Sequence, residues 1–133
     1  MVIGRSFADE MIAHAREGAP EEICGFLARD ADDQVCKLYR ITNIEHSERF
    51  YVMDSQEQLH ALLEMDRTNL EPAAVYHSHP ATEPRPSQHD IDLAKWPGLR
   101  FIIVSLRNPQ NPEIRVWNIE DGQVTEEPLT VDG

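Results

Sequence analysis

The chain has 133 residues and a mass of 15.2 kDa, which is enough for one domain with its own hydrophobic core. Its formal charge is −12, and its 12 basic residues are scattered singly, which argues against a nucleic-acid-binding surface. No apolar run reaches the ~18 residues of a membrane span, and no signal-peptide pattern opens the chain. We therefore expect a cytoplasmic protein formed by a single domain over residues 1–133.

The N-terminal part of the chain predicts a helix followed by a strand hairpin. Residues 6–18 carry apolar side chains at helical spacing, with Ser6 as the cap and Gly18 as the stop. The apolar run 23–28 and the alternating run 35–41 predict the two strands of the hairpin, because an acidic turn separates them.

The two cysteines fall in these predicted strands. A disulfide between Cys24 and Cys36 is conceivable, but a reducing compartment would keep both as thiols. We interpret Cys36 as a small core or surface residue. Cys24 is interpreted as a buried structural thiol, with a place near a metal ion as the alternative.

The middle of the chain predicts a short strand, a second helix and a third strand. Residues 50–52 form the short strand, and Asp54-Ser55 caps a helix that runs to about residue 69. Residues 73–77 predict a compact strand that places two histidines at its far end. The inner face of the second helix is predicted to consist of Leu59, Leu62 and Leu63, with Met65 as a further candidate.

The C-terminal half predicts a third helix and a run of strands. Three prolines make 80–86 an extended loop, and Ser87 opens a helix that continues to about Trp96. Asp121-Gly122 marks a hairpin turn. The interleaved elements predict an α+β layered domain in which about three helices flank a mixed, mostly antiparallel sheet. Its last strand patterns are residues 100–106, 113–119 and 123–129.

Two histidines and a carboxylate form a candidate metal site. His77 and His79 lie two residues apart on an extended strand, so both imidazoles project to the same face. Asp90 lies in the first turn of the third predicted helix, and the proline-rich loop can fold back to bring it to the strand end. Two imidazoles and a carboxylate leave the fourth tetrahedral position of a zinc ion for water. We therefore expect one Zn²⁺ per chain.

Hydrolysis of a peptide bond at such a site also requires a base that is not itself a ligand. Glu22, at the start of the first predicted strand, is the best-placed carboxylate by motif. Each element also has a simpler interpretation: two surface imidazoles, a helix capping box formed by Ser87 and Asp90, and a solvated glutamate. The joint order and spacing of these residues favours the catalytic interpretation.

The pattern resembles the signature of the JAMM family, also called MPN-plus metallopeptidases: an upstream Glu, then H-x-H, seven residues, S, two residues and D. Glu22, His77, His79, Ser87 and Asp90 fill every position of it, and the likeness covers nearly the whole chain. The resemblance implies the layered, cytidine-deaminase-like MPN fold and zinc bound by the two histidines and the aspartate. It also implies Glu22 as the general base and Ser87 as a hydroxyl donor to the tetrahedral oxyanion.

Length and local sequence indicate the small prokaryotic branch that resembles the Mec peptidases. The chain has little beyond the catalytic core, and the segments Glu22-Ile23-Cys24-Gly25 and 43–52 look like the Mec pattern. The resemblance implies that the partner is a ubiquitin-like sulfur carrier protein with a Gly-Gly C-terminus. The enzyme would release the amino acid attached to that tail, cysteine in this branch, and regenerate the carrier.

Asn43 and the residues around Phe50 are candidates for the groove that receives this tail, with a simple cap and strand as the alternative. Two other functions stay open: an isopeptidase that removes ubiquitin-like modifiers from lysine, and a non-catalytic MPN scaffold that only binds a partner. The oligomeric state, a homodimer included, also stays open. Residues expected to lie outside the site are His89, the surface residues His14, His46 and His60, and the core aromatics Tyr76 and Trp96.

Overall fold

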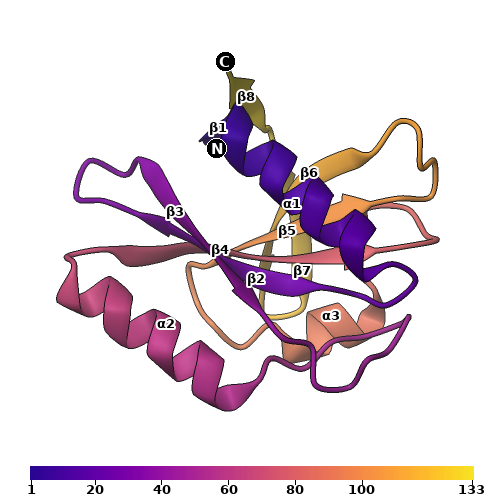
Figure 1. Cartoon of the computed structure of the whole chain (residues 1–133), viewed down its shortest axis with the longest axis horizontal. Coiled ribbons are helices and arrows are strands. Elements are labelled where there is room, and N and C mark those ends of the chain that lie inside the picture. Colours follow the sequence, from indigo (N-terminus) through magenta and orange to yellow (C-terminus); the bar gives the residue numbers. More distant parts are fainter.

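The computed structural model describes residues 1–133 as a central sheet with helices on both faces (Figure 1). The six-stranded sheet has the order β3-β2-β4-β5-β6-β7, and within it only β4 and β5 run parallel. The α+β prediction with a mostly antiparallel sheet is therefore confirmed. The strands of the sheet are β2 (Cys24–Arg29), β3 (Val35–Ile41), β4 (Glu71–His79), β5 (Arg100–Ser105), β6 (Glu113–Glu120) and β7 (Gln123–Glu127).

The three helices divide between the two faces of this sheet. Helix α1 (Arg5–Gly18) covers one face, whereas α2 (Ser55–Arg67) and α3 (Gln88–Leu93) lie on the other, as Figure 1 shows. None of them combines the length and the hydropathy that crossing a bilayer requires. A separate pair of short parallel strands, β1 (Val2–Gly4) and β8 (Thr130–Asp132), joins the two ends of the chain.

The neighbouring side chains Val75 and Tyr76 of β4 belong to different hydrophobic clusters. Tyr76 packs into the cluster that contains Met11 of α1, and Val75 packs into the cluster that contains Met65 of α2. Because successive strand residues point to opposite faces, His77 projects to the same side as Val75. The two histidines of β4 therefore lie on the face that also carries α3.

Close packing of β2 against β4 depends on Gly25. Gly25 lies opposite Tyr76 in the β2–β4 ladder, and a Cβ atom there would collide with the Tyr76 ring and with the carbonyl oxygen of Tyr39. Tyr76 is fully buried, which confirms it as a core aromatic. Its hydroxyl shares a 2.8 Å hydrogen bond with Nδ1 of His14. His14 is thus a half-buried residue rather than the expected surface one, and burial lowers its pKa to about 4.

Helix α2 is rotated relative to its predicted orientation. Its cap is Asp54, as predicted, and its buried residues are Ala61 and Met65. Leu59 and Leu63 were expected on the inner face but are 55% and 54% exposed. Leu59 and Leu63 each lie two positions from the buried Ala61, on the opposite side of the helix, so both leucines face solvent.

Three further expectations about element boundaries are wrong. Residues 50–52 form no strand; one isolated bridge joins Asn43 to Met53 at the neck of a loop. Ser6 lies inside α1, whose N-cap is Gly4, because the chain enters the helix directly from β1. Helix α3 ends at Leu93 rather than near Trp96, which precedes a proline and so is disfavoured in helical conformation.

Candidate metal centre

The candidate metal centre lies where β4 ends and α3 begins. His77 and His79 lie at the C-terminal end of strand β4. Asp90 follows Ser87 in the first turn of α3. All three side chains are buried. The fold therefore brings together the three residues that the H-x-H and S-x-x-D spacing selects.

The three candidate ligand atoms converge on one point. Nε2 of His77 lies 3.2 Å from Nε2 of His79, and Oδ2 of Asp90 lies 3.2 Å and 3.1 Å from these two nitrogens. Donor atoms about 2.0–2.1 Å from a tetrahedral zinc ion are separated by roughly 3.3–3.4 Å. The observed separations match one face of such a tetrahedron, so the donor set and its geometry fit zinc.

The tautomer of His79 is set by its second ring nitrogen. Nδ1 of His79 lies 2.8 Å from the carbonyl oxygen of Glu83, which can only accept a hydrogen bond. In the neutral ring Nδ1 therefore carries the hydrogen, and Nε2 turns a lone pair toward the other ligand atoms. The Nε1 group of Trp117 donates to the carbonyl of Pro84, which fixes the loop that supplies this acceptor.

Asp90 is held by a capping box. Its Oδ2 accepts a hydrogen bond from the Ser87 amide at 2.9 Å, and its own amide donates to Oγ of Ser87 at 3.1 Å. Burial disfavours the ionised Asp90, but His77, His79 and the Ser87 amide hold its pKa far below the usual range. The capping box is therefore present, although Asp90 is not structural only, because the same Oδ2 atom also faces both histidine rings. The capping box leaves the hydroxyl hydrogen of Ser87 free to donate elsewhere.

Glu22 precedes β2 and is 4% exposed, so it is not the solvated glutamate of the simpler interpretation. Its Oε1 atom is buried without a hydrogen-bond partner in the protein. Burial raises the pKa of Glu22 to about 8; the neighbouring His79 lowers it and Asp90 raises it further. A buried carboxylate oxygen without a hydrogen-bond partner is available to take up a proton.

Two further residues support these side chains: Ser78, to which the sequence interpretation gave no role, and Tyr51, which it placed only in the region of the candidate tail groove. Oγ of Ser78 accepts a 2.9 Å hydrogen bond from the Ile23 amide, which fixes the segment next to Glu22. The ring of Tyr51 lies against that of His77, with centroids 4.7 Å apart and an interplanar angle of 31°. No local pattern could identify either contact, because both partners are distant in the sequence.

Other candidate residues lie outside the ligand set. Cys24 is a free, buried thiol whose Sγ donates to the carbonyl of Ile41. Burial raises its pKa to about 12, which agrees with a structural role, and Cys36 is free and exposed. His89 is exposed and packs against Phe50. The other exposed histidines, as expected, are His46 and His60.

An apolar groove of about 410 Å³, with Tyr51 among its lining residues, lies on the face of the sheet that carries α2 and α3. Trp96, expected in the core, is 37% exposed and lines this groove. Gln58 and Lys95 are its polar lining residues. The groove is lined on its apolar side by Phe26, Tyr51, Val75, Leu93, Leu99 and Phe101.

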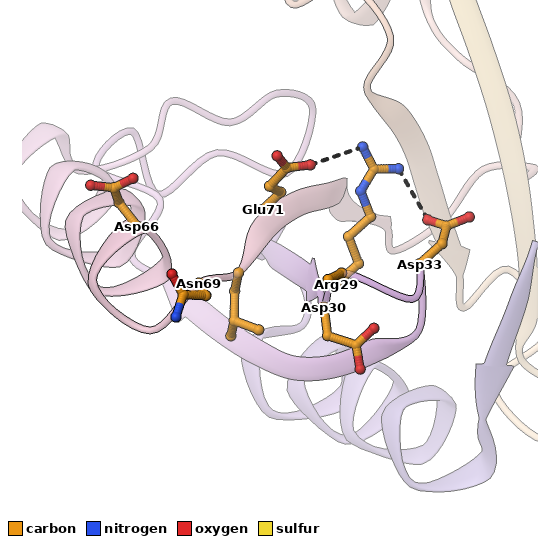
Figure 2. Close-up of a pocket in the computed structure, with 8 residues that line it drawn as sticks. Arg29, Asp30, Asp33, Asp66, Asn69 and Glu71 are labelled. Atoms are coloured by element: carbon orange, nitrogen blue, oxygen red, sulfur yellow. Dashed lines mark hydrogen bonds and ion pairs between the residues drawn. The ribbon is translucent and has the colours of Figure 1, made fainter.

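A larger hollow of about 540 Å³ lies at the opposite end of β4 (Figure 2). Arg29 and Glu71 pair with each other there, and Arg29 also contacts Asp33. Neither the metal-ligand residues nor Tyr51, Glu83 and Ser87, which contact them, line this hollow. We therefore place no part of the candidate site in it.

The sequence matches the family model described as prokaryotic homologues of the JAB domain over residues 4–120. It is 42% identical to the CysO-cysteine peptidase of Mycobacterium tuberculosis over 132 residues, which is 98% of this chain and 90% of the relative. It is 36% identical to the desampylase of Haloferax volcanii over 103 residues, 73% of this chain and 74% of the relative.

Solved structures agree with this fold. A protein from Desulfitobacterium hafniense superimposes with a TM-score of 0.88 at 37% identity, covering 98% of this chain and 92% of that one. A JAB1/MPN domain protein from Archaeoglobus fulgidus superimposes with a TM-score of 0.70 over the whole of both chains. At 21% identity, the second likeness concerns the fold alone.

Proposed function

The chain belongs to the family of prokaryotic JAB-domain homologues as a JAMM-type peptidase, and we propose that it releases cysteine from a ubiquitin-like carrier protein. The scissile bond is the amide between the C-terminal glycine of a Gly-Gly tail and the cysteine amine. Hydrolysis adds water across this bond and yields the free carrier carboxylate and free cysteine. One catalytic domain over residues 1–133, acting in the cytoplasm, is part of the same proposal.

The observation that carries the proposal is the convergence of three ligand atoms beside a buried, unpartnered carboxylate. His77, His79 and Asp90 would hold a single zinc ion. When bound, that ion supplies Lewis acidity for the scissile carbonyl and makes water nucleophilic near neutral pH. Glu22 is available for proton transfer because none of the ligand contacts involves it.

Glu22 transfers the proton in this reaction, and Ser87 stabilises the oxyanion. Oε1 of Glu22 accepts the proton that water loses as it attacks the carbonyl carbon, and it then donates that proton to the leaving amine. A base works best when its pKa lies near the working pH, and burial raises the pKa of Glu22 to about 8. The hydroxyl hydrogen of Ser87 donates to the oxygen that gains negative charge in the transition state.

The apolar groove beside Tyr51 is the proposed path of the carrier tail. Tyr51 lines this groove and its ring also contacts that of the metal ligand His77, so the groove adjoins the candidate metal centre. Its largely apolar lining suits apolar side chains upstream of Gly-Gly.

A cysteine adduct is favoured over a lysine isopeptide by the extent of similarity. The match to the CysO-cysteine peptidase extends over 98% of this chain, whereas the match to the desampylase extends over 73%. The desampylase similarity supports the second candidate, an isopeptidase acting on carrier–lysine conjugates. The two candidates share the metal centre and differ in the amine that leaves.

Offering the zinc-loaded protein both conjugates of one carrier separates these candidates. One substrate has cysteine at the carrier C-terminus, and the other has the same C-terminus joined to a lysine side chain. Because both conjugates release the same carrier, each is assayed in a separate reaction, and mass spectrometry of the released carrier should give a higher kcat/KM for the cysteine adduct. Exclusive cleavage of the isopeptide would overturn the cysteine assignment, and the metal-free protein serves as the blank.

A further inference from the structure

The loop of residues 43–53, called here the Asn43 loop, holds the backbone of Glu22 on both sides. The amide of Glu22 donates to the carbonyl of Ser47 at 2.8 Å, and the carbonyl of Glu22 accepts from Nδ2 of Asn43 at 3.0 Å. Glu22 precedes the first ladder pair of β2, which is formed by Cys24. The two backbone hydrogen bonds of Glu22 itself are therefore made to this loop, whereas those of the adjacent Ile23 are made to Ser78 of β4.

The same loop also contacts both elements that carry the candidate ligands. Tyr51 covers one face of the His77 ring on β4, with centroids 4.7 Å apart. The Phe50 ring packs against His89, which precedes Asp90 on α3, with centroids 5.1 Å apart. One segment thus links the proposed base to the strand and to the helix of the metal centre.

The Asn43 side chain closes this loop. Its Nδ2 donates to the carbonyls of Glu22 and Phe50, at 3.0 Å and 3.2 Å. Its Oδ1 accepts from the amides of Glu45 and Val52, both at 3.1 Å. Asn43 is 7% exposed, and both its donors and its acceptor are in use. The amide therefore has no free group to offer a substrate tail, in contrast to the interpretation from sequence.

We infer that Asn43 is a positioning residue for the peptidase reaction, which sets Glu22 relative to the candidate metal ligands through the backbone bonds of the Asn43 loop. Asn43 acts through Glu22 and does not touch the reacting atoms. The inference rests on the proposed function, because it takes Glu22 as the base. A buried amide that bonds to four backbone groups holds a loop more rigidly than any one surface contact could.

The substitution Asn43→Asp tests this role. It keeps an oxygen that accepts from Glu45 and Val52, but it replaces the two donated bonds by an oxygen that faces two carbonyls. We expect kcat to fall on the order of 10²-fold, with KM little changed and zinc content unchanged, because a small displacement of a catalytic group has this effect. The matched control is Asn118→Asp, since Asn118 makes a similar amide bond to Glu127 on β7.

Hydrogen exchange supplies a readout that does not depend on activity. The Glu22 amide bonds to Ser47 in the loop, whereas the adjacent Ile23 amide bonds to Oγ of Ser78 on β4. In Asn43→Asp the Glu22 amide should exchange faster while the Ile23 amide keeps its wild-type rate. A general loss of stability would accelerate both amides together.

Two results overturn the inference: a wild-type kcat in Asn43→Asp, or a kcat loss accompanied by equal acceleration of both amides. Glu22→Gln is measured in parallel. Full turnover in Glu22→Gln would overturn the base assignment, and this inference with it. Lost turnover in Glu22→Gln together with a wild-type kcat in Asn43→Asp would overturn the role of Asn43 alone.

Discussion

The two ends of strand β4 both carry charged groups, but they differ in how those groups are solvated. At the C-terminal end, His77, His79 and Glu22 are at most 5% exposed. At the N-terminal end, Arg29 pairs with Asp33 and Glu71, whose side chains are 67% and 75% exposed (Figure 2). The first group is withheld from water, and the second is surrounded by it.

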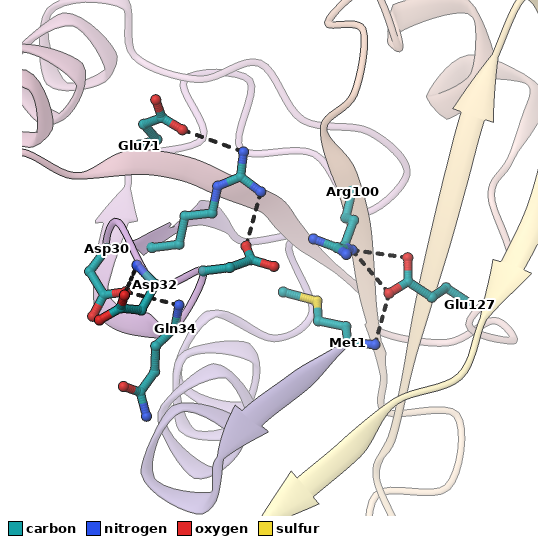
Figure 3. A network of polar contacts seen from close by, with 9 residues as sticks. Met1, Asp30, Asp32, Gln34, Glu71, Arg100 and Glu127 are labelled. Carbon is teal, nitrogen blue, oxygen red and sulfur yellow. Dashed lines mark hydrogen bonds and ion pairs between the residues drawn. The ribbon is translucent and has the colours of Figure 1, made fainter.

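A buried carboxyl without a partner and a paired carboxyl also show opposite pKa shifts. Burial raises the pKa of Glu22 to about 8. Desolvation acts in the same sense on Glu127, but hydrogen bonds from the Met1 amine, Arg100 and Asn118 lower its pKa to about 2. Figure 3 shows the contacts of Met1 and Arg100 with this carboxylate. Pairing makes a carboxylate inert near neutral pH, whereas isolation keeps a carboxyl able to exchange a proton there. Reactivity is therefore expected only at the buried end.

Removing one of the three candidate metal ligands should have the largest effect on the buried end of β4. His77→Ala, His79→Ala and Asp90→Ala should each lose the metal and all measurable turnover, because two remaining donors hold zinc poorly. Elemental analysis after dialysis checks the metal content, and His60→Ala is the matched surface control. Full zinc occupancy in any of the three variants would exclude that residue from the ligand set.

Replacing Glu22 should separate chemistry from metal binding. Glu22→Gln should keep zinc but lose about 10²- to 10⁴-fold in kcat, the usual contribution of a general base. Steady-state kinetics and metal analysis on the same preparation check both parts. A variant that turns over at the wild-type rate would leave the reaction without its proposed base.

The same variant should change how stability depends on pH in the metal-free protein. Burial raises the pKa of Glu22 in the folded state to about 8 from its ordinary value of 4.5, so between these limits the folded state holds a proton that the unfolded state has lost. This contribution favours folding at low pH and is lost as pH rises toward 8. Urea unfolding should show Glu22→Gln gaining stability over the wild type across that window. A constant difference from pH 5 to pH 8 would contradict the raised pKa.

Ser87 should show a smaller effect with two separable parts. Ser87→Ala removes the helix cap, at about 1 kcal/mol, and the proposed oxyanion donor, at about 10²-fold in kcat. Ser87→Asp can still cap α3 but cannot donate when ionised, so it should recover stability without recovering rate. Ser87→Thr keeps both groups and is the control. Recovery of kcat in Ser87→Asp would assign Ser87 a capping role only.

The buried end was largely predictable from the sequence because its residues are linked by local geometry. His77 and His79 share a face through the strand period, and Ser87 and Asp90 are linked by the first turn of a helix. The contact of Tyr51 with His77 and the acceptor carbonyl of Glu83 were not predictable, because they depend on how the loops fold back.

The errors in the fold prediction have a similar origin. Both Leu59 and Leu63 have the hydropathy of core residues, yet α2 buries Ala61 and leaves both leucines facing solvent. The pairing of β1 with β8 joins three residues from each end of the chain, too short a pattern to recognise. The orientation of α2 and the pairing of β1 with β8 therefore depend on tertiary packing and long-range pairing, which local periodicity does not reveal.

Removing charge at the exposed end should have the smallest effect. Arg29→Ala should change the free energy of unfolding by no more than about 0.5 kcal/mol, because exposed ion pairs gain little over their hydrated components. Loss of both pairs of Arg29 should leave kcat, KM and zinc content at wild-type values, since its side chain lies at the opposite end of β4 from the ligands. Urea unfolding and steady-state kinetics check the two parts, with Glu71→Gln as the partner variant. A kcat lowered in both variants would show that the hollow in Figure 2 is coupled to the metal centre, and the division between a reactive and an inert end of β4 would fail.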